Sequence, residues 1–403
     1  MTGTAVVVFA VTLLVAVLIS ERAHRTVLST AVLFLVAGFL VGGGMLNLLP
    51  LGADHPLVRQ VAELALFSVL FTDGMRSGVR DLTRAWRLPG RALLFGLPLS
   101  LVGTALVAHW VAGVPWTEAF LLGAVLSPTD PVFAAAIVGR EEIPWRLRHL
   151  LNVESGLNDG LALPIVVVLL AAAGGGEIDG AELAGELALG VGIGIVVPWA
   201  AIALERTSVF AAAGTYQPLG VFAIGLLVLG LSLLTHANLF LAAFAAGITV
   251  ATIAPEMRDA FRGFGELVTE LLKLAALLVF GALISPAFLA ETPASGYVFA
   301  VLAIVAVRPL SIVLALAGGR LGWRELGAAA WFGPKGFASV VYGLLVLGSG
   351  IARADELFHL IAIVIALSIL AHSSTDVLVA RLFREPRPAP EPVSDASGDD
   401  TVR

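Results

Sequence analysis

Two short polar stretches interrupt apolar segments and carry oxygen-bearing side chains at close spacing. The first, LSPTDPVF at 126–133, holds Thr129 and Asp130 between two prolines. The second, LLNVESGLNDGLALP at 150–164, holds four polar residues close together: Glu154, Ser155, Asn158 and Asp159. Oxygen ligands suit hard cations, and a carboxylate also takes up a proton. These residue types therefore predict reversible binding of a cation or a proton.

Helical periodicity sorts the second stretch into two neighbouring faces. At 3.6 residues per turn, Ser155 and Asp159 stack on one face, and Glu154 and Asn158 stack on the adjacent one. One face can thus present several ligands to an ion. Glu154 and Asn158 also have a structural interpretation, in which they only hold helices together. An acid such as Asp159 within a membrane is costly and is by default a functional residue.

The two prolines of the first stretch predict a broken helix. Pro128 and Pro131 each lack an N–H and clash with the preceding turn, so the helix must open around Thr129 and Asp130. The freed backbone groups survive only where they are buried in protein or line a wet cavity. A carboxylate there is suited to bind a cation or a helix end. The alternative is a simple proline kink, in which Asp130 caps the second half-helix.

The composition requires a membrane to hold these elements. The chain has 403 residues, 58% hydrophobic and 13% charged, with a mean hydropathy of +0.96, too apolar for a soluble core of this size. Apolar runs long enough to cross the hydrocarbon recur throughout. We expect an all-α polytopic membrane protein of about thirteen spans: 4–20, 27–49, 57–75, 92–112, 116–139, 150–173, 182–204, 216–235, 237–254, 265–284, 296–317, 325–348 and 355–380.

Charge distribution predicts the orientation. With the N-terminus outside, the inward loops and the C-terminal tail carry nineteen of the 24 Lys and Arg residues, as expected for cytoplasmic loops. The transmembrane domain then covers residues 1–383. The tail, 384–403, is rich in proline and polar residues, so we expect it to be disordered and cytoplasmic.

The span count also predicts an internal repeat. Six spans, one connecting span and six more allow the second half to insert upside down relative to the first. The fifth span is broken at its prolines, and the twelfth, GAAAWFGPKGFASVVYG, is similarly broken by Pro334. Because each occupies the fifth place in its half, the two breaks predict a site near the middle of the membrane.

Several other classes of function lack support in the sequence. A net charge of -6 over short loops makes no basic face for nucleic acid, and the absence of cysteine excludes disulfides and thiolate metal sites. The seven histidines are scattered. A membrane enzyme would need a nucleophile, a metal cluster or a signature such as HExxH or GxSxG, and we find none. A passive cation channel or uniporter remains the main alternative to an exchanger.

The motifs SPTDP, ESGLND and GPKG together resemble the monovalent cation:proton antiporters of the sodium/proton exchanger type. The resemblance implies two discontinuous helices that cross in mid-membrane, with Thr129 and Asp130 in the unwound stretch. It implies that Asp159 exchanges Na⁺ for a proton and that Ser155 is a further ligand. Asn158 marks the branch of the family that exchanges electroneutrally. Burial raises the pKa of a carboxylate and a bound cation lowers it, so the two ions compete for one anion.

The resemblance also gives expectations for the remaining charges. It implies that Arg308 pairs with Glu154, and that the positive charge of Lys335 offsets carbonyl ends in the twelfth span, where the family pattern has Arg. Asp73 matches an acidic position near a cytoplasmic funnel, although a surface pair with Arg76 is equally ordinary. Lys273 is expected to be structural, paired with Glu270 or Glu266 or snorkelling to the interface.

These expectations combine into one hypothesis. Spans 4–6 and 11–13 form a moving ion-binding core, and spans 1–3 and 7–10 form a dimer scaffold. The protein is a secondary active antiporter, not an enzyme, which exchanges Na⁺ (or Li⁺ or K⁺) for H⁺ by alternating access. It needs no cofactor. We expect a homodimer in the plasma membrane, with a cytoplasmic C-terminus.

Overall fold

The computed structural model describes residues 2–23, 30–52, 54–76, 87–130, 143–174, 180–207, 210, 214–381 and 383. Within these ranges the chain forms helices joined by turns, with two isolated bridges and no strand. The predicted all-α fold is therefore confirmed. The tail predicted for 384–403 lies outside the described residues.

The helices follow the predicted spans closely. In chain order they are α1 (Thr2–Ala23), α2 (Thr30–Val41), α3 (Pro56–Arg76), α5 (Arg87–Arg91), η1 (Ala92–Gly96), α6 (Leu97–Ala112), α7 (Trp116–Leu126), α9 (Trp145–Ala173), α10 (Gly180–Glu205), η3 (Gly214–Tyr216), α11 (Gln217–Thr235), α12 (Leu239–Ile253), α13 (Pro255–Leu283), α14 (Pro286–Glu291), α15 (Ala294–Leu302), η4 (Ala303–Val307), α16 (Arg308–Leu316), α17 (Trp323–Trp331), α18 (Phe337–Leu347) and α19 (Ala354–Arg381). Each predicted span overlaps a helix or an interrupted helix. Six helices of the described chain are long and apolar enough to cross a membrane.

Among the span ends that lie within the described residues, two differ from the prediction by eight residues or more. The span expected at 27–49 is helical only to Val41, and a turn follows. The span expected to begin at residue 265 belongs to α13, which already starts at Pro255. Its first turns carry Arg258, Asp259 and Arg262. These charges lower the local hydropathy, so the start of the helix was predicted too late in the sequence.

The fourth and eleventh predicted spans share an unusual local structure. Each contains one π-helical segment, η1 and η4, and each segment is followed by a proline at the start of the next helix, Pro98 or Pro309. A proline supplies no N–H to the preceding turn, and a π-helical turn is one way to absorb the loss. η1 packs on α16, and η4 packs on α6. The matching positions, fourth in each half, agree with the predicted repeat.

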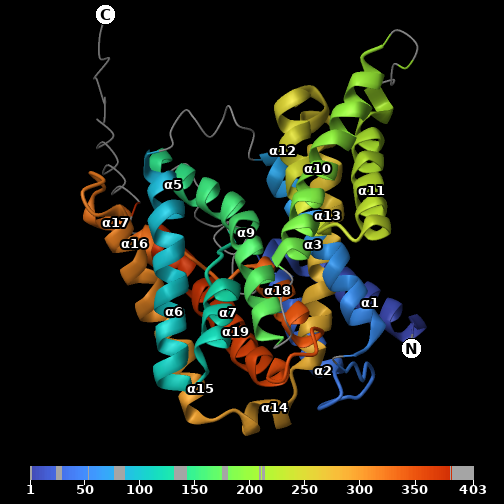
Figure 1. Ribbon diagram of the computed structural model, residues 1–403. Coiled ribbons are helices and arrows are strands. Elements are labelled where there is room, and N and C mark those ends of the chain that lie inside the picture. Colours follow the sequence, from blue (N-terminus) through green and yellow to red (C-terminus); the bar gives the residue numbers. More distant parts are fainter. Residues whose placement is uncertain are drawn as a thin grey trace, which may run out of the picture.

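The helices pack as two groups. The first group contains α1, α2, α3 and α10 to α13, and the second contains α5 to α7, α9 and α15 to α19 with their π-helical segments (Figure 1). Packing between the groups runs mainly from α3, α12 and α13 to α9 and α18. The site described below lies along this boundary.

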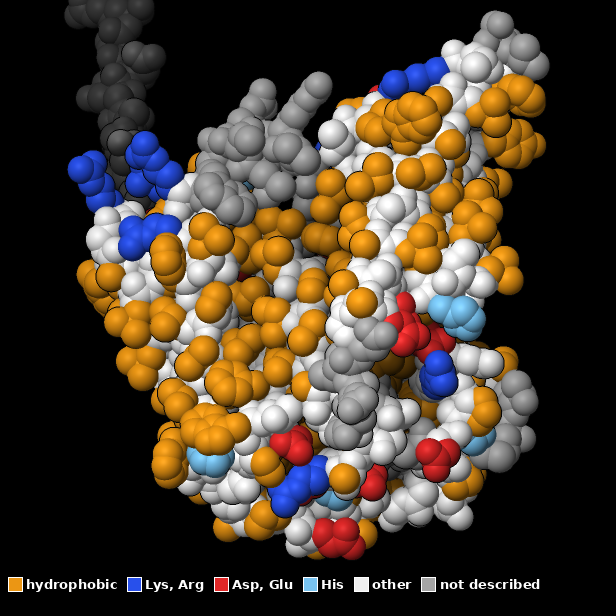
Figure 2. Space-filling model, viewed as in Figure 1, with side chains coloured by type: hydrophobic (Ala, Val, Ile, Leu, Met, Phe, Trp, Pro, Cys, Tyr) orange, Lys and Arg blue, Asp and Glu red, His pale blue; other side chains and the backbone are white. Residues whose placement is uncertain are grey.

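The outer surface is apolar over most of its height. Hydrophobic side chains cover the middle of the face in Figure 2, with Lys and Arg gathered toward its upper end and most Asp and Glu toward its lower end. Large apolar residues such as Leu18, Trp110 and Leu234 are more than 70% exposed. A surface of this kind is stable against lipid and not against water, so the chain is a multi-pass membrane protein.

Candidate functional site

Two helix interruptions meet at the centre of the second group. α7 ends at Leu126, and α17 and α18 are separated by the non-helical residues 332–336. Thr129 forms an isolated antiparallel bridge with Lys335, and the Asp130 N–H donates to the Pro334 carbonyl at 3.2 Å. Each break thus supplies hydrogen-bond partners for the other, as buried polar backbone requires. The described part of the predicted crossing is present, since the segment after α7 pairs with the break between α17 and α18. The half-helix expected after Pro131 lies outside the described residues.

Gly336 makes this close crossing possible. A Cβ atom at this position would lie 2.5 Å from the Asp130 Cβ and 2.9 Å from the Asp130 backbone nitrogen. Any other residue would therefore force the two backbone segments apart. The sequence analysis did not single out Gly336, although its place after Pro334 and Lys335 in GPKG was the available signal.

The polar face of α9 lies against the first interruption. Asn158 Nδ2 donates to Thr129 Oγ1 at 2.8 Å, and Thr129 Oγ1 lies 3.2 Å from Ser155 Oγ. All three residues are at most 6% exposed. The structure thus brings together hydroxyl and amide groups that the sequence places in two separate spans.

Asp159 is buried beside this cluster, and its carboxylate can accept further hydrogen bonds or a ligand. It is 3% exposed, and its Oδ1 atom has no hydrogen-bond partner among the described residues. Asn158 Oδ1 is in the same condition. The charges that act on Asp159 are those of Asp73, Asp130 and Lys273. Because an unpaired buried oxygen is costly, the Asp159 oxygen is suited to a cation or a proton, and the Asn158 oxygen to a cation.

Tyr342 fixes the backbone at this point. Its hydroxyl donates to the Asp159 carbonyl at 2.8 Å, and its side chain is fully buried. The contact ties α18 to α9 across 183 positions of sequence. No pattern along either helix indicated it, so the sequence analysis missed this residue.

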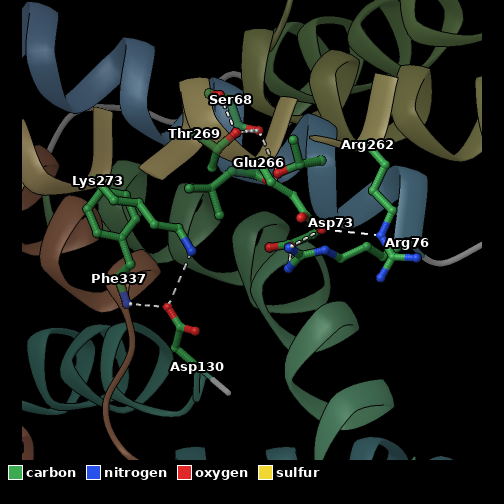
Figure 3. Close-up of polar contacts among 11 residues, drawn as sticks. Ser68, Asp73, Arg76, Asp130, Arg262, Glu266, Thr269, Lys273 and Phe337 are labelled. Carbon is green, nitrogen blue, oxygen red and sulfur yellow. Dashed lines mark hydrogen bonds and ion pairs between the residues drawn. The ribbon is translucent and has the colours of Figure 1, made fainter. Parts of the chain in front are cut away.

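Lys273 does not pair as the sequence analysis expected. Its Nζ atom lies 3.6 Å from Asp130 Oδ2 and not against a carboxylate of its own helix (Figure 3). Asp130 Oδ2 also accepts from the Phe337 N–H at 3.4 Å. The expectation was wrong because it considered only acids one or two turns away on α13. The available signal was the cost of a lysine inside a span, which favours a functional partner.

A cavity of about 430 Å³ approaches Lys273 between α3 and α13. Its lining consists of Thr72, Arg76, Gly263, Glu266, Leu267, Thr269, Glu270 and Lys273. Asp73, 6% exposed, pairs with Arg76 at 3.4 Å, and Arg76 also contacts Glu266 at 3.2 Å (Figure 3). The two interpretations of Asp73, a surface pair and an acid near a funnel, are therefore compatible. Asp73 pairs with Arg76, and its charge also acts on Asp159.

A second cluster of charged side chains joins α9, α16 and the break between α17 and α18. Arg308 Nη2 donates to Glu154 Oε1 at 2.5 Å, and both side chains are at most 4% exposed, so the expected pair is present. Gly333 leaves room for the guanidinium, because a Cβ there would collide with Arg308. Lys335 is 1% exposed and interacts with the charges of Arg308 and Glu154, and its N–H donates to Ser368 Oγ at 2.8 Å.

Fold and site together define a class of protein. A polytopic helical bundle holds the buried Asp159 carboxylate close to the point where the segment after α7 meets the break between α17 and α18. A cavity reaches Lys273, which contacts Asp130 in that segment. Such an arrangement is the hallmark of secondary transporters, whose sites sit where helices are unwound at the repeat interface.

Comparison with known proteins identifies the family. Residues 9–381 match the family described as "Sodium/hydrogen exchanger, transmembrane". The chain belongs to this family.

Individual relatives align with nearly the whole of this chain. The chain is 27% identical over 394 residues to the K(+)/H(+) antiporter NhaP2 of Shewanella oneidensis, with 94% of this chain and 67% of the relative covered. It is 25% identical over 383 residues to the K(+)/H(+) antiporter NhaP of Alkalimonas amylolytica, covering 92% and 65%. The sodium proton antiporter MjNhaP1 from Methanocaldococcus jannaschii has the same fold, with a TM-score of 0.77, 19% identity, and 94% and 99% covered.

Proposed function

We propose that the chain is a secondary active antiporter that exchanges a monovalent alkali cation for a proton at Asp159. The observation that carries the proposal is the buried Asp159 carboxylate with an unpaired Oδ1, placed beside the helix crossing. Thr129, Asp130, Ser155 and Asn158 supply further oxygens around it. The relatives that align with nearly the whole of this chain are named for K⁺ and the structural neighbour for Na⁺, so both cations are candidate substrates.

Competition at one anion is sufficient for coupling. A cation and a proton each neutralise the carboxylate, and the buried site disfavours a bare charge. If the access of Asp159 changes from one side of the membrane to the other only when it holds one of the two ions, a proton gradient drives the cation against its own gradient. No cofactor is needed for this exchange.

The two helix groups provide the moving parts. We assign the second group, which carries Asp130 and Asp159, to the ion-binding core, and the first group to a dimer scaffold. Alternating access then follows from displacement of one group against the other. Arg76, Arg258 and Arg262 lie at the cavity end of α3 and α13. By the positive-inside rule the cavity faces the cytoplasm, with the N-terminus outside and the C-terminus inside the plasma membrane.

Reconstitution tests the exchange directly. Purified protein in liposomes with a pH-sensitive dye and an imposed pH gradient is expected to move protons when Na⁺, Li⁺ or K⁺ is added, and not when choline is added. The order of responses gives the selectivity. A passive channel would instead pass the cation without any pH gradient and without moving protons, and that result would refute obligatory exchange.

Electroneutral exchange is the finer proposal, and it rests on Asn158 beside Asp159. One monovalent cation exchanged for one proton moves no net charge, so the membrane potential does no work on the cycle. With the pH gradient clamped, the transport rate is expected to be the same at zero and at about 100 mV, although moving one net charge at that voltage is worth about 2.3 kcal/mol. A rate that rises steeply with voltage would contradict a neutral stoichiometry.

A further inference from the structure

Lys273 connects the two helix groups at the ion site. It lies on α13 of the first group, while Asp130 lies at the helix break of the second group. Their charged atoms are 3.6 Å apart, and the two residues are 9% and 5% exposed. A buried lysine keeps its charge only when it has such a partner. The ammonium therefore contacts an oxygen that a transported cation would also use.

The cavity leads to this contact along one face of α13. Glu266, Glu270 and Lys273 all line it, and their spacing of four and then three residues puts them on the same side of the helix. Glu266 is paired with Arg76, which also lines the cavity, so a cation that enters meets Glu270 and then the ammonium. Glu270 attracts it, and the lysine repels it at the last step before Asp130.

We propose that Lys273 sets the affinity for the transported cation on the cavity side, by competing with it for Asp130. The inference rests on the proposed exchange function and adds a specificity-determining residue to it. The competition needs only the fixed positive charge of Lys273. Because Lys273 and Asp130 belong to different helix groups, movement of the core separates them. The competitor therefore acts on one side of the membrane only.

Neutralising the lysine gives the first test, in proteoliposomes with known sidedness. In Lys273→Gln the KM for the cation at the cavity side is expected to fall about tenfold, the order of magnitude for removal of one like charge at this range. The KM at the opposite face is expected to stay unchanged. Glu270→Gln is the matched control, because it removes a charge of opposite sign from the same helix face. Its cavity-side KM is expected to rise.

Chemical restoration of the charge separates electrostatics from packing. The chain contains no cysteine, so Lys273→Cys offers a single thiol. 2-Aminoethyl methanethiosulfonate attaches an ammonium through a disulfide and releases methanesulfinate, and it is expected to return the KM toward the wild-type value. Methyl methanethiosulfonate attaches a neutral group of the same linkage and leaves the KM low. A bilayer-impermeant trimethylammonium reagent identifies the cavity side by reacting from that side alone.

Three results would overturn the inference: an unchanged or higher cavity-side KM in Lys273→Gln, an equal fall on both sides, or identical kinetics for the two adducts. Should the neutral variants not fold, Lys273→Arg keeps the buried charge. A guanidinium holds a carboxylate with two parallel hydrogen bonds, so its cavity-side KM is expected to rise, and an unchanged or lower value would count against competition. Failure of the wild-type protein to exchange any cation is a separate result, which refutes the proposed function itself.

Discussion

Asp159→Asn is expected to reduce cation-dependent proton movement to the level of protein-free liposomes. The substitution keeps the size of the side chain and one acceptor oxygen, replaces the other oxygen with an NH₂ donor, and removes the charge that a cation and a proton share. An amide is uncharged at neutral pH, so it provides neither the cation nor the proton with the anion that each binds. The dye response to Na⁺, Li⁺ and K⁺ in reconstituted protein measures the loss.

The control for this variant is the same change at an exposed acid of α13. Asp259 is 65% exposed at its side chain and pairs with its neighbour Arg258, so Asp259→Asn is expected to retain exchange. Both variants should elute from size exclusion like the wild-type protein. Normal exchange by folded Asp159→Asn would mean that another group carries the coupling.

The sequence predicted those parts of the site that one helix carries by itself. The polar face of α9 follows from helical periodicity, and the interruptions before Asp130 and around Pro334 follow from the missing proline N–H. These are local properties, and hydropathy located the helices around them. The pairing of Glu154 with Arg308 came from a family resemblance, since nothing in the spacing of residues 154 positions apart encodes it.

Contacts between distant helices were the part that could not be predicted. Lys273 has acids one and two turns away on its own helix, and a reading confined to that helix prefers them. The structure turns this face of α13 toward the second group, where Asp130 lies closer. The contact of Tyr342 with the Asp159 carbonyl and the space at Gly336 depend equally on how elements cross, which no periodicity reports.

The ion pair of Glu154 and Arg308 is expected to make the largest contribution to stability among the charges of the site. Replacing either partner alone leaves a buried charge without its counter-ion, which costs about 3–5 kcal/mol. The double variant Glu154→Leu with Arg308→Met removes both charges of the pair and leaves Lys335 as the remaining buried cation, and we expect it to be more stable than the variant that loses Glu154 alone. Thermal unfolding in detergent, followed through the fluorescence of the seven tryptophans, measures all three. Equal losses in the three variants would argue against the pair.

The two single losses are not expected to be equal. Lys335 interacts with both Arg308 and Glu154, so Glu154 balances two buried cations, whereas Arg308 balances one acid that still has Lys335 nearby. Glu154→Gln should therefore lower the Tm more than Arg308→Met does. The exposed pair of Arg59 and Glu63, 2.7 Å apart with side-chain exposures of 77% and 24%, is the matched control. Removing Arg59 is expected to cost less than about 1 kcal/mol, because water replaces the lost partner there, whereas the Arg308 and Glu154 side chains are only 3% and 4% exposed.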